Sequence, residues 1–274
     1  MTAVTATPAA WSSRLRVTQA RVLRSEWTKL RSLRSTRWSM LAAVLLTAGL
    51  PCLVAAIVSS HWGHMRPAER AHRHPLEIAL FSVNISQLAI GVLGVLIITG
   101  EYSTGMIRAT IGAVPRRLPV LWAKTAVYAA VAFLLMLPCV FVSFFATQAI
   151  LSKHPALKLS LSDPGVARAV IGAALYLTVA GIFALALGAI TRNTAGGIAV
   201  FAAIIFVIPP LMNVLPSNWD NAISPYLPSS AGGSVFSLTR GAHTLAPWPG
   251  FALFVGYTAL AVAVAAVLLV RRDA

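Results

Sequence analysis

Charge and cysteine are both scarce in this chain of 274 residues. Only 11% of the residues are Asp, Glu, Lys or Arg, whereas an ordinary soluble domain carries about 25%. Because 58% of the residues are apolar, the composition excludes a water-soluble globule and a disordered chain. Two cysteines, Cys52 and Cys139, cannot form a disulfide framework, and their apolar surroundings are typical of reduced core thiols. We therefore expect an integral membrane protein.

Motifs for catalysis and nucleotide binding are also missing. None of the four lysines follows a glycine, so the chain has no G-x-x-x-x-G-K-[ST] phosphate loop. No Ser/His/Asp or His/Glu set stands out within the apolar segments. The four histidines between residues 61 and 74 lie among arginines, which repel cations, so no metal site is expected there. The chain itself is expected to be no enzyme and to bind no cofactor.

Six apolar stretches are long enough to cross a bilayer, which takes about 20 residues of helix. They cover residues 38–58, 76–99, 119–150, 166–190, 196–215 and 251–270. None shows the alternation of a barrel strand, so the fold class is all-α, a polytopic membrane protein with six transmembrane helices. The domain organisation is a tail with a surface helix (1–37), a transmembrane domain (38–270) and a short C-terminus (271–274). Pro138 allows a kink in the third span, and Pro209 with Pro210 is expected to interrupt the fifth.

The basic residues predict the orientation. With both termini in the cytoplasm, fifteen Lys and Arg lie on that side against seven outside, and the N-terminal tail contributes eight of the fifteen. This is the positive-inside bias of multi-pass proteins, and it favours an orientation with both termini cytoplasmic. The net charge of +15 is then explained by topology and by contact with the lipid bilayer, so nucleic acid is not expected as a partner.

Residues 15–37 form a basic amphipathic pattern ahead of the first span. At 100° per residue, one arc holds the apolar side chains of Leu15, Val22, Leu23, Trp27, Leu30 and Leu33. Such a helix is expected to lie along the inner membrane surface. Glu26 interrupts the apolar arc, which indicates either a specific partner or pairing with Lys29 or the nearby arginines.

A second short helix is expected between the second and third spans, over residues 103–113. Ile107 and Ile111 lie four residues apart on one face. So short a helix is unstable alone, so either it docks in a groove of another protein or it is an ordinary interfacial turn. Similarly, the long apolar connection at 216–250 is expected to hold one or two short re-entrant or interfacial helices.

Polar and small residues mark two of the spans. In the second span, Asn84 and Gln87 share one predicted face with Glu77, Gly91 and Gly94. That face either holds two helices together or lines a translocation path. In the fourth span, a stripe of small residues is typical of close helix packing: Ala180, Ala184 and Gly188.

Two stretches carry a family resemblance. One is LRSEWTKLRS at residues 23–32, and the other is GEYSTGMIR at residues 100–108, followed by Pro115-Arg116-Arg117 and Lys124. In this arrangement the chain resembles bacterial ATP-binding-cassette (ABC) exporter permeases of type 2. The resemblance implies a six-helix subunit that pairs with a second permease subunit, as a homodimer or a heterodimer. It also implies docking to a separate nucleotide-binding ATPase subunit, which holds the ATP and magnesium.

The resemblance assigns roles to particular residues. The tail helix corresponds to the connecting helix, with Glu26, Trp27 and Leu30, and the inner helix corresponds to the coupling helix. Within that coupling segment it implies positioning by Glu101 and Arg108 and apolar anchoring by Ile107 and Ile111, while Asn84 and Gln87 are candidates for a substrate path. The expected function is export of an apolar or amphipathic substrate. The alternatives are an ion-coupled carrier or channel, and a membrane scaffold or sensor subunit that transports nothing.

Overall fold

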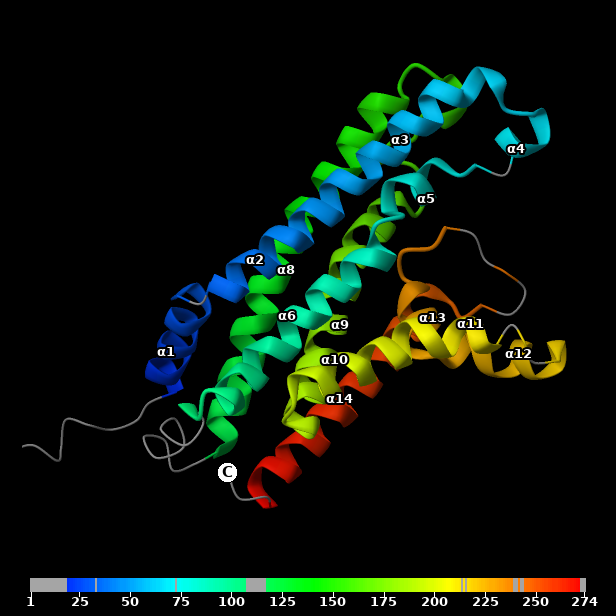
Figure 1. The fold of residues 1–274 in the computed structure, drawn as a ribbon. Coiled ribbons are helices and arrows are strands. Elements are labelled where there is room, and N and C mark those ends of the chain that lie inside the picture. The colour runs from blue at the N-terminus through cyan, green and yellow to red at the C-terminus, as the bar shows by residue number, and fades with distance from the viewer. Residues whose placement is uncertain are drawn as a thin grey trace, which may run out of the picture.

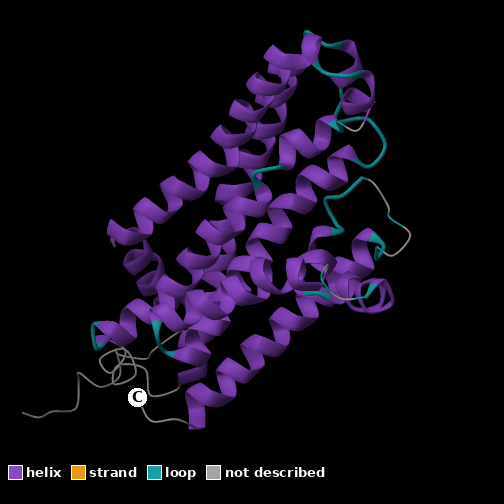
Figure 2. Cartoon of the chain, turned by 45° about the vertical axis from the view of Figure 1, so that its right-hand side comes forward, coloured by secondary structure: helices purple, strands orange, loops and turns teal. Residues whose placement is uncertain are grey.

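A computed structural model of the chain describes residues 19–32, 34–71, 73–106, 117–212, 214, 216–238, 241 and 244–271. Across these residues the chain is helical, with no strand (Figure 2). Six helical segments are long and apolar enough to cross a membrane: Ser35–His64, Pro75–Ser103, Leu118–Leu151, Val166–Thr191, Thr194–Met212 and Pro247–Arg271. The predicted fold class, an all-α polytopic membrane protein, is confirmed.

The first span contains a π-helical turn. It consists of α2 (Arg34–Val44), the π-turn η3 (Leu45–Gly49) and α3 (Leu50–His61). A π-turn leaves backbone carbonyls without their usual intrahelical partners. Here the buried Ser82 hydroxyl, from the second span, donates to the backbone oxygen of Thr47 at 3.0 Å. The irregular turn is therefore stabilised by a neighbouring helix.

The second span is broken, contrary to the sequence prediction of one continuous helix. A short α5 (Pro75–Leu80) ends at a turn, and α6 (Val83–Ser103) begins two residues later. A hydroxyl from the third span supplies a donor at the break, because Ser143 Oγ bonds the backbone oxygen of Ala79 at 2.9 Å.

The polar face that the sequence placed on one side of the second span is exposed at one end and buried at the other. Glu77 and Asn84 are exposed, whereas Gln87, Gly91 and Gly94 are buried. Glu77 and Asn84 lie on either side of the turn and line the same cavity. The exposed and buried parts of the predicted face therefore divide between Asn84 and Gln87, within α6.

The core lies where α6 packs against α9 (Val166–Thr191). The predicted small-residue stripe is confirmed, since Ala180 and Ala184 are fully buried. A side chain at Gly94 would meet the backbone oxygen of Gly181 at 2.3 Å. The two helices therefore approach to backbone contact, which only small residues allow.

The third and fifth spans show how the helices accommodate proline. The third span is part of α8 (Arg117–Leu151), which continues through Pro138. The fifth consists of α10 (Thr194–Ala202), the π-turn η6 (Ala203–Val207) and α11 (Ile208–Met212), so the helix continues past Pro209 and Pro210. The expected interruption is wrong, because the wider π-turn just before the prolines accommodates their rings and their missing N–H groups.

Short helices occupy the long connection between the fifth and sixth spans, as predicted. They are α12 (Ser217–Ile223), the 3-10 turn η7 (Ser224–Tyr226) and α13 (Pro228–Gly233). Of these, α13 packs against α14 (Pro247–Arg271). The remaining short elements lie in the other connections: η4 (Trp62–His64), α4 (Pro67–Ala71) and η5 (Pro155–Leu157).

The amphipathic helix of the tail is α1 (Gln19–Ser32), which packs against α8 at the end of the bundle where α14 finishes (Figure 1). Val22 and Leu30 are buried, as the apolar arc predicts, but Trp27 is 48% exposed. Glu26, which interrupts that arc, is only 4% exposed. The surface that α1 turns toward the bundle is therefore partly charged.

Candidate functional site

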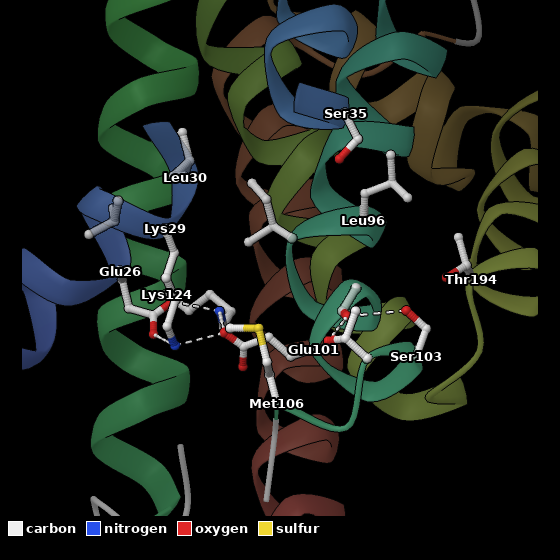
Figure 3. A pocket seen from close by; sticks show the side chains of 14 residues that line it. Glu26, Lys29, Leu30, Ser35, Leu96, Glu101, Ser103, Met106, Lys124 and Thr194 are labelled. Atoms are coloured by element: carbon white, nitrogen blue, oxygen red, sulfur yellow. Dashed lines mark hydrogen bonds and ion pairs between the residues drawn. The ribbon is translucent and has the colours of Figure 1, made fainter. Parts of the chain in front are cut away.

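Four charged side chains from three helices meet at this end of the bundle (Figure 3). Glu26 and Lys29 lie one turn apart on α1, Glu101 lies in the last turn of α6, and Lys124 lies near the start of α8. We call these four residues the ionic cluster. Three of them, Glu26, Glu101 and Lys124, are less than 9% exposed.

Each lysine of the ionic cluster bridges both carboxylates. Lys124 Nζ lies 2.5 Å from Glu26 Oε2 and 2.9 Å from Glu101 Oε1. Lys29 Nζ lies 2.8 Å from Glu26 Oε1 and 2.9 Å from Glu101 Oε1. These charge-assisted hydrogen bonds are individually strong, and together they tie α1 to α6 and α8.

The ionic cluster contains two carboxylates and two ammonium groups, so it is electrically balanced. Burial alone would lower the pKa of Lys29, but the hydrogen bonds and charges of Glu26 and Glu101 outweigh burial and raise it. The two carboxylates therefore favour the charged form of Lys29. Glu101 Oε2 is the exception in this arrangement, since it is buried and has no hydrogen-bond partner among the described residues.

The last turn of α6 also contacts a residue outside the ionic cluster, Arg192, through Tyr102. The guanidinium carbon of Arg192 lies 5.4 Å from the centroid of the Tyr102 ring. Arg192 ends α9 in a left-handed conformation with φ of 53°, and its Nη2 lies 3.4 Å from the backbone oxygen of Leu268 in α14. Consecutive residues, Glu101 and Tyr102, thus connect α6 to α1 and α8 in one direction and to α9 and α14 in the other.

A cavity of about 420 Å³ adjoins the ionic cluster. All four cluster residues line it, together with aliphatic side chains such as Leu96 and a set of hydroxyl groups. Figure 3 shows Glu101 between the other charged groups and Ser103. The volume is within the range of about 300–1,000 Å³ usual for small-molecule sites.

The structure describes only part of the predicted coupling segment. Glu101 and the residues up to Met106 are described, whereas Ile107, Arg108 and Ile111 lie outside the described residues. On the tail helix, Glu26 and Leu30 line the cavity and Trp27 does not. Glu26 pairs with Lys29, one of the two possibilities that the sequence left open, and also with Lys124.

The two candidates for a substrate path lie apart from the ionic cluster and differ from each other. Gln87 is buried and accepts a hydrogen bond from the Tyr176 hydroxyl of α9, while its amide donates to the backbone oxygen of Asn84 at 2.9 Å. Gln87 thus joins two helices. Asn84 is exposed and lines a separate cavity of about 390 Å³ at the opposite end of α6, beside Glu77 and Leu159.

Sequence reasoning did not single out Lys124 as a site residue. The signal was present, since Lys124 is the only charged residue between positions 118 and 151, a strongly apolar stretch. A lysine in such a segment usually has a carboxylate partner. The partners themselves, 23 and 98 residues earlier in the chain, could not be identified from the pattern.

Groups of His, Cys, Asp or Glu that could hold a metal ion do not occur among the described residues. Comparisons with known proteins give no further identification: no protein-family model matches the chain, and no curated protein matches it.

Proposed function

We propose that this chain is the membrane-spanning subunit of an ABC exporter, driven by ATP hydrolysed on a separate nucleotide-binding subunit. The proposal is supported chiefly by the position of the ionic cluster. The connection between the second and third spans begins after Ser103, two residues beyond Glu101, and ends where α8 begins at Arg117, seven residues before Lys124. Both flanks of that connection are therefore bound to each other and, through Glu26, to α1.

This arrangement suits the transmission of a mechanical force. A partner that binds the connection and moves it acts on α1, α6 and α8 together, because the buried charges resist separation. Tyr102 and Arg192 extend the attachment to α9 and α14. In the proposed mechanism, ATP binding closes two partner subunits, and this attachment carries their motion into two paired permease subunits to export an apolar or amphipathic substrate.

The main alternative, an ion-coupled carrier, is less well supported. In the six described spans, the Asp, Glu, Lys and Arg residues lie near the span ends, and the one deepest in sequence is Lys124, seven residues into its span. Carriers and pumps that relay protons or cations usually hold ionisable groups near the midplane. The membrane scaffold or sensor, the other alternative, has no specific observation in its favour.

The proposal assigns the chain to a bacterial plasma membrane with both termini in the cytoplasm. The ionic cluster, α1 and the end of α14 then all lie on the cytoplasmic side, where an ATPase has access to nucleotide. The tail arginines and lysines would lie there as well, as the positive-inside bias requires.

The test is purification of the affinity-tagged chain from its native membrane. We expect a phosphate-loop ATPase subunit to co-purify, and ATP hydrolysis by the complex to disappear when the phosphate-loop lysine of that subunit is replaced by alanine. The chain alone should hydrolyse no ATP. Transport that continues without any ATPase but stops when the ion gradient is dissipated would establish the carrier instead.

A further inference from the structure

A second cavity, of about 390 Å³, lies at the end of α6 opposite the ionic cluster, and three parts of the chain form it. They are α5 with the start of α6, the loop residue Leu159, and residues 236–238, which follow α13. Three of the lining residues, Glu77, Phe81 and Asn84, are exposed. A ligand can therefore reach the lining of this second cavity from the surface of the protein.

The walls of the second cavity are fixed by hydrogen bonds from neighbouring segments. The guanidinium of Arg168, in α9, donates to the backbone oxygens of Val235 at 2.6 Å and Ser237 at 2.9 Å. The backbone N–H of Leu159 donates to Gln148 Oε1 at 2.9 Å. The second cavity is therefore preformed, so binding costs little ordering of its walls.

The charge that faces the second cavity is negative. With histidine counted as neutral, Glu77 is the one residue with a formal charge among the described residues that line it. The Glu77 carboxylate has no hydrogen-bond or ion-pair partner in the described part of the chain. Arg73 and Lys158 adjoin lining residues in the sequence, but both are exposed and neither lines the cavity. Because the guanidinium of Arg168 is bound to backbone oxygens, Glu77 is available to a cation.

Aromatic and aliphatic side chains make up much of the remaining wall. Phe81 and Phe236 line the second cavity together with leucines such as Leu80 and Leu159. An aromatic ring attracts a cation that lies over its face, and leucine side chains favour an apolar body on a ligand. The lining thus combines a single negative charge with an apolar surface.

From this we infer that the second cavity binds an amphipathic organic cation, whose charged group pairs with Glu77. The apolar body of the cation then lies against Phe81, Leu159 and Phe236. Identification of this cation as the exported substrate rests on the proposed function, whereas its binding does not.

The probe for the test is (1-pyrenylmethyl)trimethylammonium, a fluorescent organic cation. Its matched control is 1-neopentylpyrene, in which a carbon atom replaces the charged nitrogen and the shape is kept. Binding is measured by fluorescence titration of the purified full chain in dodecyl maltoside micelles, against micelles without protein. Because His74 also lines the cavity, the titration is made at about pH 8, above the range in which histidine ordinarily becomes charged. We expect saturable binding of the cation and at least tenfold weaker binding of the uncharged isostere. Equal affinity for the two probes, or no saturable binding of the cation, would overturn the proposal.

The role of the carboxylate is tested by Glu77→Gln, which removes the charge and keeps the size of an exposed side chain. This variant should bind the cation at least tenfold more weakly and the uncharged isostere as the wild-type chain does. The control is Glu69→Gln, which removes another exposed carboxylate at the same end of the bundle, in α4 (Figure 1), and does not line the cavity. If the two variants bind the cation equally, Glu77 does not hold it and the proposal is wrong.

The position of the cation is tested by filling the second cavity. Asn84 lines the cavity and is exposed, so Asn84→Trp should fold normally and bind the cation at least tenfold more weakly. The control is Leu88→Trp, one turn further along α6, since Leu88 is also exposed but does not line the cavity. Equal binding of the cation by these two variants would place it elsewhere on the protein and contradict the proposal.

Two sources of the cation are distinguished by adding lipid to the micelles. Phosphatidylcholine carries a trimethylammonium group, whereas phosphatidylglycerol has similar acyl chains and no cationic group. Displacement of the probe by phosphatidylcholine alone assigns the site to a lipid headgroup, and retention of the probe with both lipids assigns it to a free organic cation. Equal displacement by both lipids would show competition by acyl chains and contradict recognition of a cation. All of these measurements use the chain without an ATPase, so a failed ATPase test leaves the binding result intact, and the reverse also holds.

Discussion

Lys124 Nζ lies 2.5 Å from Glu26 Oε2, although 98 residues separate the two in the chain. The contact joins a helix that precedes the first span to a helix that belongs to the third. Neither group is more than 4% exposed, so the pair is shielded from the water and salt that weaken surface ion pairs. The attachment of α1 to the bundle therefore depends on a small number of buried charges as well as on apolar contact.

Replacing Lys124 should destabilise the protein strongly. Lys124→Ala leaves Glu26 and Glu101 sharing the single ammonium of Lys29, and breaking one side of a buried ionic network costs about 3–5 kcal/mol. The measurement is the unfolding midpoint of the purified protein in mixed micelles. Lys153→Ala is the matched control, because Lys153 is exposed and its loss should change the midpoint little. Equal midpoints for the two variants would contradict the buried network.

The close approach of α6 and α9 predicts a second effect on stability. Gly94→Ala introduces a methyl group that would lie 2.3 Å from the backbone oxygen of Gly181, and a backbone atom cannot move aside cheaply. Overpacking of this kind costs about 1–3 kcal/mol. Gly256→Ala, with nothing within 4 Å of its Cβ, should be neutral in the same unfolding assay. If Gly94→Ala left the unfolding midpoint unchanged, the two helices would have to lie farther apart than in this structure.

The proposed orientation can be tested by labelling intact cells. In a chain carrying Cys52→Ala and Cys139→Ala, single cysteines at Ser35 or Ser103 should be shielded from an impermeant thiol reagent. Cysteines at Ser60 or Ser152 should react, because both positions are exposed at the other end of the spans, Ser60 in the last turn of α3 and Ser152 directly after α8. Reaction at position 103 from outside would reverse the orientation and remove the proposed contact with a cytoplasmic ATPase.

The contribution of Lys29 to the stability of the folded protein should change with pH only in the alkaline range. Its pKa in the folded protein is raised above the ordinary value of 10.5, so the stability it contributes is fully present below that value. That stability is lost as the pH rises through the higher folded pKa. The measurement is the difference in unfolding midpoint between the wild-type chain and Lys29→Met at several pH values. We expect the difference to be constant from pH 7 to about 10 and to shrink above that, and a difference that disappears by neutral pH would contradict it.

Several features were predictable from the sequence, because each depends on a local property of the chain. The six spans follow from apolar runs of membrane-spanning length, and the structure contains all six. The helical tail follows from an apolar arc with a period of 3.6 residues, and α1 forms there. The small residues Ala180, Ala184 and Gly188 predicted a close helix contact, which α6 and α9 make.

Only the tertiary structure decided which residues compensate for local irregularities and isolated charges. The break after Leu80 and the π-turn at Thr47 are stabilised by donors from other helices, Ser143 and Ser82. For that reason the break in the second span could not be predicted from the sequence. Likewise, the sequence showed Glu26 to be unusual, because it interrupts an apolar arc. No local pattern identified Lys124 as its partner. A buried charge or an unpaired carbonyl requires a partner wherever the fold can bring one, and spacing along the chain does not encode which residue that is.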